Sequence, residues 1–128
     1  MLAKLVVPGI FVAAIINLLP VVGVFGNSWL KSLYGFDVSG ADLEILLRHR
    51  AVLFGIVGVF LLAGVVWPNV RTSAILVAAA SMASFIVVAL IVGEYSSAIT
   101  KIVLADVIGL AALLPAFVVG HLSHQSSE

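Results

Sequence analysis

One acidic side chain, Asp106, lies inside a strongly apolar stretch of the sequence, between Val103 and Ile108. An ionised carboxylate in the apolar interior of a membrane costs a few kcal/mol unless it is paired or hydrated. We therefore expect Asp106 to face other helices rather than lipid. There it could pair with a cation or exchange a proton.

The candidate partners of Asp106 are Arg48, His49 and Arg50, which are expected to lie at a similar depth in the membrane. An ion pair between Asp106 and an arginine is our central structural prediction. On a helical wheel, Arg48 shares a face with small residues, which favours Arg48, whereas Arg50 points nearly the opposite way and could reach the lipid headgroups. Glu44, four residues before Arg48, offers that arginine a competing partner. If Arg48 pairs with Glu44, then Arg50 or His49 remains as the partner of Asp106.

Other polar residues are expected in the same leaflet, near the ends of the first and third apolar runs. The predicted polar pocket comprises Asn17, Arg48, His49, Arg50, Glu94, Tyr95 and Asp106. These residues could hold a ligand, or they could form a buried clamp that fixes the register of the helices. The two interpretations are compatible. No metal site and no cofactor are predicted, since His121 and His124 have no third ligand on their side of the membrane.

The composition defines the elements that must position these side chains. The chain has 128 residues, 63% of them hydrophobic, and only 9% are charged, against about 25% in soluble domains. These values exclude a soluble enzyme and a disordered tail. A net charge of zero gives no electrostatic footprint for nucleic acid, and the absence of cysteine excludes a disulfide scaffold and a thiol nucleophile. The composition therefore indicates an integral membrane protein.

Four apolar runs approach the roughly 20 residues that a membrane helix needs, and they predict helices over about 4–25, 40–67, 71–93 and 98–121. A capping-box pattern at Ser39–Asp42 is expected to start the second helix. Tight connections after the second and third runs predict antiparallel neighbours, so we expect an all-α membrane fold, a four-helix antiparallel transmembrane bundle, as one domain over 1–128. The first run could instead be a cleaved signal peptide, although its apolar core is longer than the usual stretch of about 7–15 residues.

The connection between the first two runs, residues 27–35, predicts a short interfacial helix that ends at Gly35. Trp29, Leu30, Leu33 and Tyr34 are expected to face lipid from this helix. Small residues on the longer helices predict close helix packing, within the chain rather than in a dimer. These residues are Gly55, Gly58, Ala105, Gly109, Ala112, Ala116 and Gly120. Pro20 and Pro115 are expected to interrupt backbone hydrogen bonds in their helices.

The segment 46–55, LLRHRAVLFG, follows an interfacial LYG at 33–35, and together they resemble small bacterial DoxX-like four-helix membrane proteins. The step from Arg50 to Ala51, followed by Gly55, is the closest match, and Ala105–Asp106 fits as well. The resemblance spans most of the chain on short motifs. It implies a multi-pass protein of the inner (plasma) membrane with cytoplasmic termini, although the count of Lys and Arg on the two sides does not decide the orientation. It also singles out Arg50, where the helical wheel favours Arg48.

Three functions fit these observations. The favoured one is a non-catalytic accessory subunit or a lipid- or quinone-binding module, with a polar pocket at one leaflet. Some DoxX-like proteins are accessory subunits of quinone-linked oxidoreductases, so the resemblance implies a larger membrane complex as partner and a bound lipid or quinone. The alternative is a small proton-coupled transporter that uses Asp106 and forms a homodimer through the small-residue stripe. A weaker alternative is a lipid-modifying or isomerase-like enzyme, with Asp106, Glu94 or His49 as acid and base.

Overall fold

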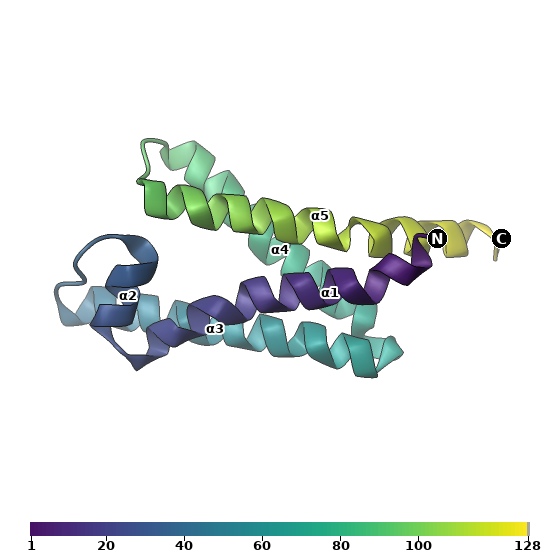
Figure 1. Ribbon diagram of the computed structural model, residues 1–128, viewed down its shortest axis with the longest axis horizontal. Coiled ribbons are helices and arrows are strands. Elements are labelled where there is room, and N and C mark those ends of the chain that lie inside the picture. Colours follow the sequence, from purple (N-terminus) through teal and green to yellow (C-terminus); the bar gives the residue numbers. More distant parts are fainter. Residues whose placement is uncertain (128) are drawn as a thin grey trace.

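The computed structural model describes residues 1–127 as a set of helices joined by short connections (Figure 1). In chain order these are α1 (Ala3–Leu18), the 3-10 segment η1 (Leu19–Phe25), α2 (Asn27–Tyr34), α3 (Ala41–Val66), α4 (Pro68–Val92) and α5 (Ser97–Gln125). Four helical segments are long and apolar enough to cross a membrane: α1 continued by η1, α3, α4 and α5. The predicted all-α four-helix membrane bundle is therefore confirmed, and the chain is a multi-pass membrane protein.

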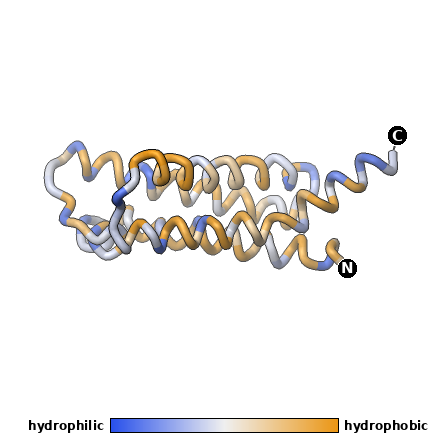
Figure 2. Tube along the Cα trace, turned by 90° about the horizontal axis from the view of Figure 1, so that it is seen from above, coloured by the Kyte–Doolittle hydropathy of each residue, from blue (hydrophilic) through white to orange (hydrophobic). Residues whose placement is uncertain are grey.

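The four long helices pack as a square. α1 contacts α3 and α5, and α4 closes the square by contacting the same two helices. Both chain termini lie at one end of the bundle, which we call the terminal end (Figure 1). The opposite end holds α2, the start of α3 and the loop between α4 and α5, and we call it the α2 end. Figure 2 shows the hydrophilic colours gathered at the α2 end and near the C-terminus, with a long apolar stretch between them.

The helix predicted over 4–25 is α-helical only as far as Leu18. Pro20 has no N–H to donate to the carbonyl of Ile16, and its ring would crowd that carbonyl in a regular α-helix. The chain therefore continues to Phe25 in the tighter 3-10 form. Gly26, with φ of +137°, then turns the chain into α2.

The start of α3 differs from the predicted capping box at Ser39. Gly40 occupies the N-cap position with φ of +90°, and no side chain caps the helix there. A side chain at Ser39 lies one residue too early to reach the free N–H groups of the first turn. α3 begins at Ala41, and Trp67 alone separates its end from α4.

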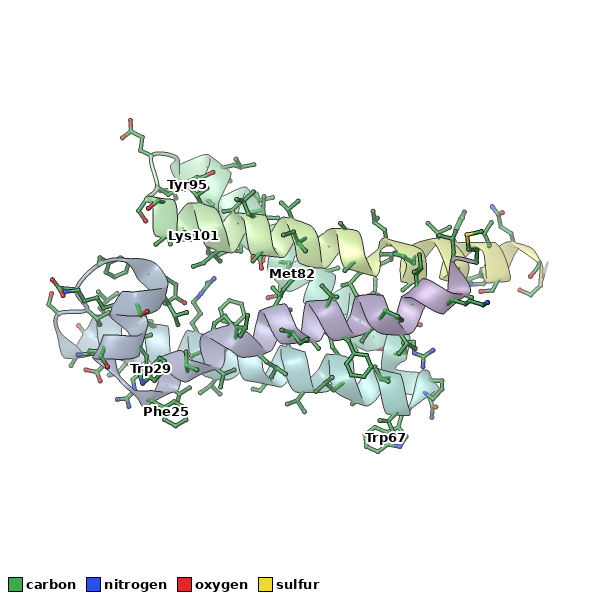
Figure 3. All side chains as sticks on the ribbon, in the orientation of Figure 1. Phe25, Trp29, Trp67, Met82, Tyr95 and Lys101 are labelled. Atoms are coloured by element: carbon green, nitrogen blue, oxygen red, sulfur yellow. The ribbon has the colours of Figure 1, made fainter. Side chains whose placement is uncertain are left out.

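The predicted interfacial helix is confirmed as α2, and Gly35 ends it in the left-handed conformation, with φ of +76°. The prediction that Leu30 and Tyr34 face lipid is wrong, because both are buried in the protein. Leu30 fills the space above Gly23 of η1, where an added Cβ would lie 2.8 Å from its side chain. Trp29 is exposed, and Figure 3 shows it at the end of the molecule opposite Trp67.

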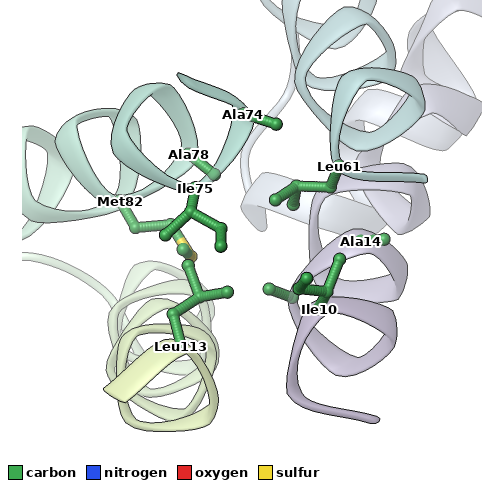
Figure 4. Packing of buried hydrophobic residues seen from close by; sticks show 9 residues of the cluster. Ile10, Ala14, Leu61, Ala74, Ile75, Ala78, Met82 and Leu113 are labelled. Atoms are coloured by element: carbon green, nitrogen blue, oxygen red, sulfur yellow. The ribbon is translucent and has the colours of Figure 1, made fainter. Parts of the chain in front are cut away.

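The apolar core lies mainly in the half of the bundle nearer the terminal end, and Figure 4 shows how its side chains pack together. Its buried members are Ile10, Ala13, Ala14, Leu61, Ala74, Ile75, Ala78, Met82 and Leu113. Small residues let the helices approach closely there. Gly9 of α1 lies directly against the backbone carbonyl of Ala112 on α5, and Gly58 of α3 lies against Leu18 of α1. This half of the bundle is therefore tightly packed.

We predict that Gly9→Ala destabilises the protein by about 1–3 kcal/mol, because the new methyl group would meet a backbone atom that cannot rotate away. Gly120→Ala is the matched control, since no atom lies within 4 Å of an added Cβ at that position. It should be neutral or slightly stabilising, because alanine favours a helix over glycine. Thermal unfolding in detergent, followed by circular dichroism, measures both. Equal stabilities for the two variants would contradict the contact between α1 and α5.

Candidate functional site

Arg50 of α3 lies over two aromatic rings at the α2 end of the bundle. Its guanidinium carbon is 4.7 Å from the ring centre of Phe54 and 4.6 Å from the ring centre of Phe85 on α4. Both distances are typical of cation–π interactions. The Nε atom of Arg50 is buried and has no hydrogen-bond partner among residues 1–127. Two phenylalanine rings therefore hold this cation.

Two further polar residues are buried inside the bundle. Asn17 of α1 is 1% exposed and Asp106 of α5 is 4% exposed. The Asn17 amide donates to the Ala13 carbonyl at 2.8 Å, and its nitrogen lies 3.9 Å from the sulfur of Met82. Asn17 Oδ1 and Asp106 Oδ2 have no hydrogen-bond partner within the described part of the chain. Unpaired buried polar atoms are unusual in proteins, because each keeps its full desolvation penalty.

Shared neighbours place these three residues in one region. The sulfur of Met82, beside Asn17, also lies 2.6 Å from the position of a Cβ added to Gly109, which is almost one turn beyond Asp106 on α5. Phe85, which covers Arg50, is almost one turn beyond Met82 on α4. We call Asn17, Arg50 and Asp106 the polar cluster.

The predicted ion pair to Asp106 is not formed. Over residues 1–127, no lysine, arginine or histidine nitrogen lies within 4.0 Å of the Asp106 carboxylate. The pairing was inferred from a similar depth in the membrane, but α3 and α5 lie diagonally across the square, and each of them contacts α1 and α4 instead.

The helical-wheel argument that favoured Arg48 is also wrong. The Nη1 atom of Arg48 donates to Glu44 Oε1 at 2.8 Å, and its Nε atom donates to the backbone carbonyl of Val24 at 2.9 Å. That carbonyl belongs to the last turn of η1, where helix carbonyls have no partner of their own. Arg48 thus ties α3 to η1 outside the polar cluster. Arg50 instead lies against the rings of Phe54 and Phe85.

The other predicted pocket residues do not join the cluster. His49 is exposed on α3. Glu94 and Tyr95 lie in the loop after α4, where Gly93 and Glu94 both have positive φ and turn the chain away from the helix axis. Glu94 is exposed and Tyr95 is half-buried, and Figure 3 shows Tyr95 at the loop. Of the predicted set, the structure brings together Asn17, Arg50 and Asp106.

A cavity of about 490 Å³ extends from the α2 end to Asp106, and we call it the main cavity. It is lined by Ile16, Leu19, Pro20, Ser32, Leu33, Gly35, Phe54, Ser97, Ala98, Lys101, Ile102, Ala105 and Asp106. Its walls are mostly apolar, with Lys101 more than one turn closer to the α2 end than Asp106 (Figure 3). Its volume falls within the range of about 300–1,000 Å³ that is common for small-molecule sites.

Sequence reasoning missed most of the residues that line the main cavity. The α5 wall consists of two adjacent rows at four-residue spacing: Ser97, Lys101 and Ala105 form one, and Ala98, Ile102 and Asp106 form the other. That spacing is visible in the sequence and could have identified Lys101. The contributions of α2 and η1 could not be found in this way, because they depend on how the connection folds back over α5.

A second cavity, of about 280 Å³, lies between α3 and α4, and we call it the side cavity. It is lined by Arg50, Leu53, Phe54, Val57, Ser81, Ser84, Phe85 and Val88. Phe54 lines both cavities. Its ring therefore separates a cavity that contains the carboxylate of Asp106 from one that contains the guanidinium of Arg50.

The predicted packing residues have different environments. On α5, Gly109 lies against Met82 and Ile16, and the Ala112 backbone lies against Gly9. Ala105 lines the main cavity, and Ala116 packs on the apolar core. The position of an added Cβ on Gly120 has open space around it. On α3, Gly58 contacts Leu18, and a Cβ on Gly55 would lie 3.3 Å from Val21.

Comparison with models of protein families, with curated proteins and with solved structures gives no match. The function is therefore argued from the polar cluster and the two cavities.

We predict that Asp106→Asn lowers stability by less than about 0.5 kcal/mol, whereas breaking a buried ion pair costs about 3–5 kcal/mol. The reason is that Asp106 has no cationic partner within 4.0 Å in residues 1–127. Arg48→Gln is the contrasting variant, and it should cost about 1–2 kcal/mol because it removes the bonds to Glu44 and Val24. Thermal unfolding in detergent measures both. A larger loss for Asp106→Asn than for Arg48→Gln would contradict this assignment.

Proposed function

We propose that this membrane protein binds a lipid-soluble molecule with a hydroxyl or carbonyl headgroup, such as a quinol or quinone, in the main cavity. The observation that carries the proposal is the buried oxygen Asp106 Oδ2. It has no hydrogen-bond partner in residues 1–127, and its residue lines a cavity with mostly apolar walls. An apolar cavity with a few polar groups that converge on one point is the usual form of a small-molecule site.

The chemistry of the polar cluster selects the headgroup. An ionised carboxylate can only accept hydrogen bonds, whereas a protonated one can also donate. When the Asp106 carboxyl is ionised, a hydroxyl group of the ligand can donate to its Oδ2 atom. When the carboxyl is protonated, a carbonyl oxygen of the ligand can accept its proton in a hydrogen bond. Satisfying one unpaired buried polar group recovers about 1–3 kcal/mol. Lys101, nearer the α2 end of the cavity, can accommodate a second polar group of the ligand.

The role we assign to binding is non-catalytic: the chain is an accessory subunit or a lipid- or quinone-binding module of the inner membrane, with cytoplasmic termini. Its resemblance to DoxX-like proteins supports this role, because some of them are subunits of quinone-linked oxidoreductases. The enzyme alternative is weakened, since neither Glu94 nor His49 lines a cavity that contains Asp106. Those two residues were the predicted partners of Asp106 in acid–base chemistry.

We predict that Ala105→Phe abolishes binding of a short-chain quinol, because the added ring fills the main cavity next to Asp106. Ala111→Phe makes the same change on the same helix at an exposed position and should bind as the unmodified protein does. Binding is measured by equilibrium dialysis of the full chain in nanodiscs. Asp106→Ala should weaken binding about tenfold, which corresponds to the loss of one hydrogen bond to a charged group. Equal binding by Ala105→Phe and Ala111→Phe would refute the site.

Proton-coupled transport is the alternative function, and the absence of an ion pair to Asp106 is the observation that favours it. A carboxylate that no cation neutralises can take up and release a proton as the site opens. The predicted homodimer stripe gains no support, because Gly109 and Ala112 already pack against other helices of the same chain. In this case Asp106→Asn should abolish uptake driven by a pH gradient in liposomes. Quinol binding without such uptake would favour the binding module.

A further inference from the structure

We propose that the side cavity is a second binding site, which takes the oxyanion headgroup of a membrane lipid through the guanidinium of Arg50. This site lies between α3 and α4, and its lining residues other than Phe54 do not line the main cavity. The ligand class is an amphiphile that carries a carboxylate or a phosphate.

The charge and hydrogen-bonding groups of the side cavity favour an anion. Its polar lining residues are Arg50, Ser81 and Ser84, and none of its lining residues is acidic. Arginine supplies only donors, and serine hydroxyls can donate as well. Asp106 lines the main cavity instead, with Phe54 contributing to both. The Ser84 hydroxyl already donates to the backbone carbonyl of Ser81 at 2.8 Å, so a negatively charged group in the side cavity meets the guanidinium of Arg50 and the hydroxyl of Ser81.

The guanidinium of Arg50 is already held for such a ligand. Phe54 and Phe85 restrain it through their ring faces, and ring faces do not use the donors in the guanidinium plane. The buried Nε atom has no partner in the described residues. A planar guanidinium binds carboxylate and phosphate oxygens through two parallel hydrogen bonds, and prior restraint reduces the entropy lost on binding.

The depth of Arg50 favours a lipid as the source of the anion. The segment Ala51–Val66 of α3 contains no polar side chain and spans about 24 Å at about 1.5 Å per residue. A bilayer core is about 30 Å thick, so Arg50 lies close to its edge, where lipid headgroups begin. Leu53, Val57 and Val88 line the same cavity and offer an apolar path for the start of an acyl chain.

The test uses the full chain in detergent, titrated with phosphatidylglycerol or phosphatidylcholine and observed by native mass spectrometry. We expect one phosphatidylglycerol to be retained in preference to phosphatidylcholine. Arg50→Gln should weaken that retention about tenfold, as expected for loss of a charge-assisted bidentate contact. Arg48→Gln is the matched control, because it removes the same charge two residues before Arg50. The donors of Arg48 are already bound to Glu44 and to the Val24 carbonyl.

A second set of variants keeps the proposal testable if Arg50→Gln does not fold. Arg50→Lys keeps the charge but loses the planar fork, and it should bind phosphatidylglycerol more weakly than the unmodified chain. Asp106→Asn should retain the lipid, because Asp106 does not line the side cavity. Inorganic phosphate alone is a further probe. If phosphate raises the melting temperature in an Arg50-dependent way, the site takes the oxyanion without requiring the lipid tail.

Three results would overturn the proposal. The first is equal retention by the unmodified chain and by Arg50→Gln. The second is an equal loss in Arg50→Gln and Arg48→Gln, which would show a diffuse attraction to positive charge. The third is loss of the lipid in Asp106→Asn, which would place the anion outside the side cavity. A failure of quinol binding in the main cavity leaves each of these comparisons intact, so the two proposals can fail separately.

Discussion

The close approach of α1 to both of its neighbours is the constraint on which the rest of the bundle depends. Helices in a bilayer gain little from the hydrophobic effect when they meet, because lipid tails are as apolar as leucine. Here the attraction arises where glycines let the helices approach, at Gly9 against the backbone carbonyl of Ala112 and at Gly58 against the side chain of Leu18. Towards the α2 end, the interior instead accommodates Arg50 with its two phenylalanines and the carboxylate of Asp106. Both cavities of the polar cluster lie in this second half.

The two arginines of α3 show how local backbone structure assigns different roles to the same residue type. They are two residues apart and so project about 200° from each other around the helix. Pro20 converts the end of the first span to η1, and the carbonyl of Val24 in its last turn then accepts from Arg48. Glu44 occupies another Arg48 donor. Arg48 is therefore a structural tie, whereas Arg50 has a buried donor that no group in residues 1–127 accepts.

Much of the fold could be predicted from composition, because apolar runs of membrane length leave few alternatives to helices. The burial of Asp106 was also predictable, since a carboxylate inside such a run must face protein. Which helices pack against each other was not predictable from the sequence. Pairing Asp106 with an α3 arginine assumed that side chains at a similar depth lie on neighbouring helices, but α3 and α5 lie diagonally. The acceptor for Arg48 is a backbone carbonyl 24 residues earlier, and no pattern of side chains in the sequence records such a contact.

Phe54 connects the two proposed sites physically. Its ring lines the main cavity, lines the side cavity and supports the guanidinium of Arg50. A ligand that presses on this ring from the main cavity acts on the same contact that holds Arg50 in place for an anion. Coupling between two sites requires an element on which both ligands act, and it is reciprocal in free energy. The ring of Phe54, which has few alternative rotamers, is such an element, because it borders both cavities. No contact through the tightly packed terminal half is needed to connect them. With both proposed sites occupied, an anionic lipid at Arg50 and a ligand in the main cavity would therefore act on each other through Phe54.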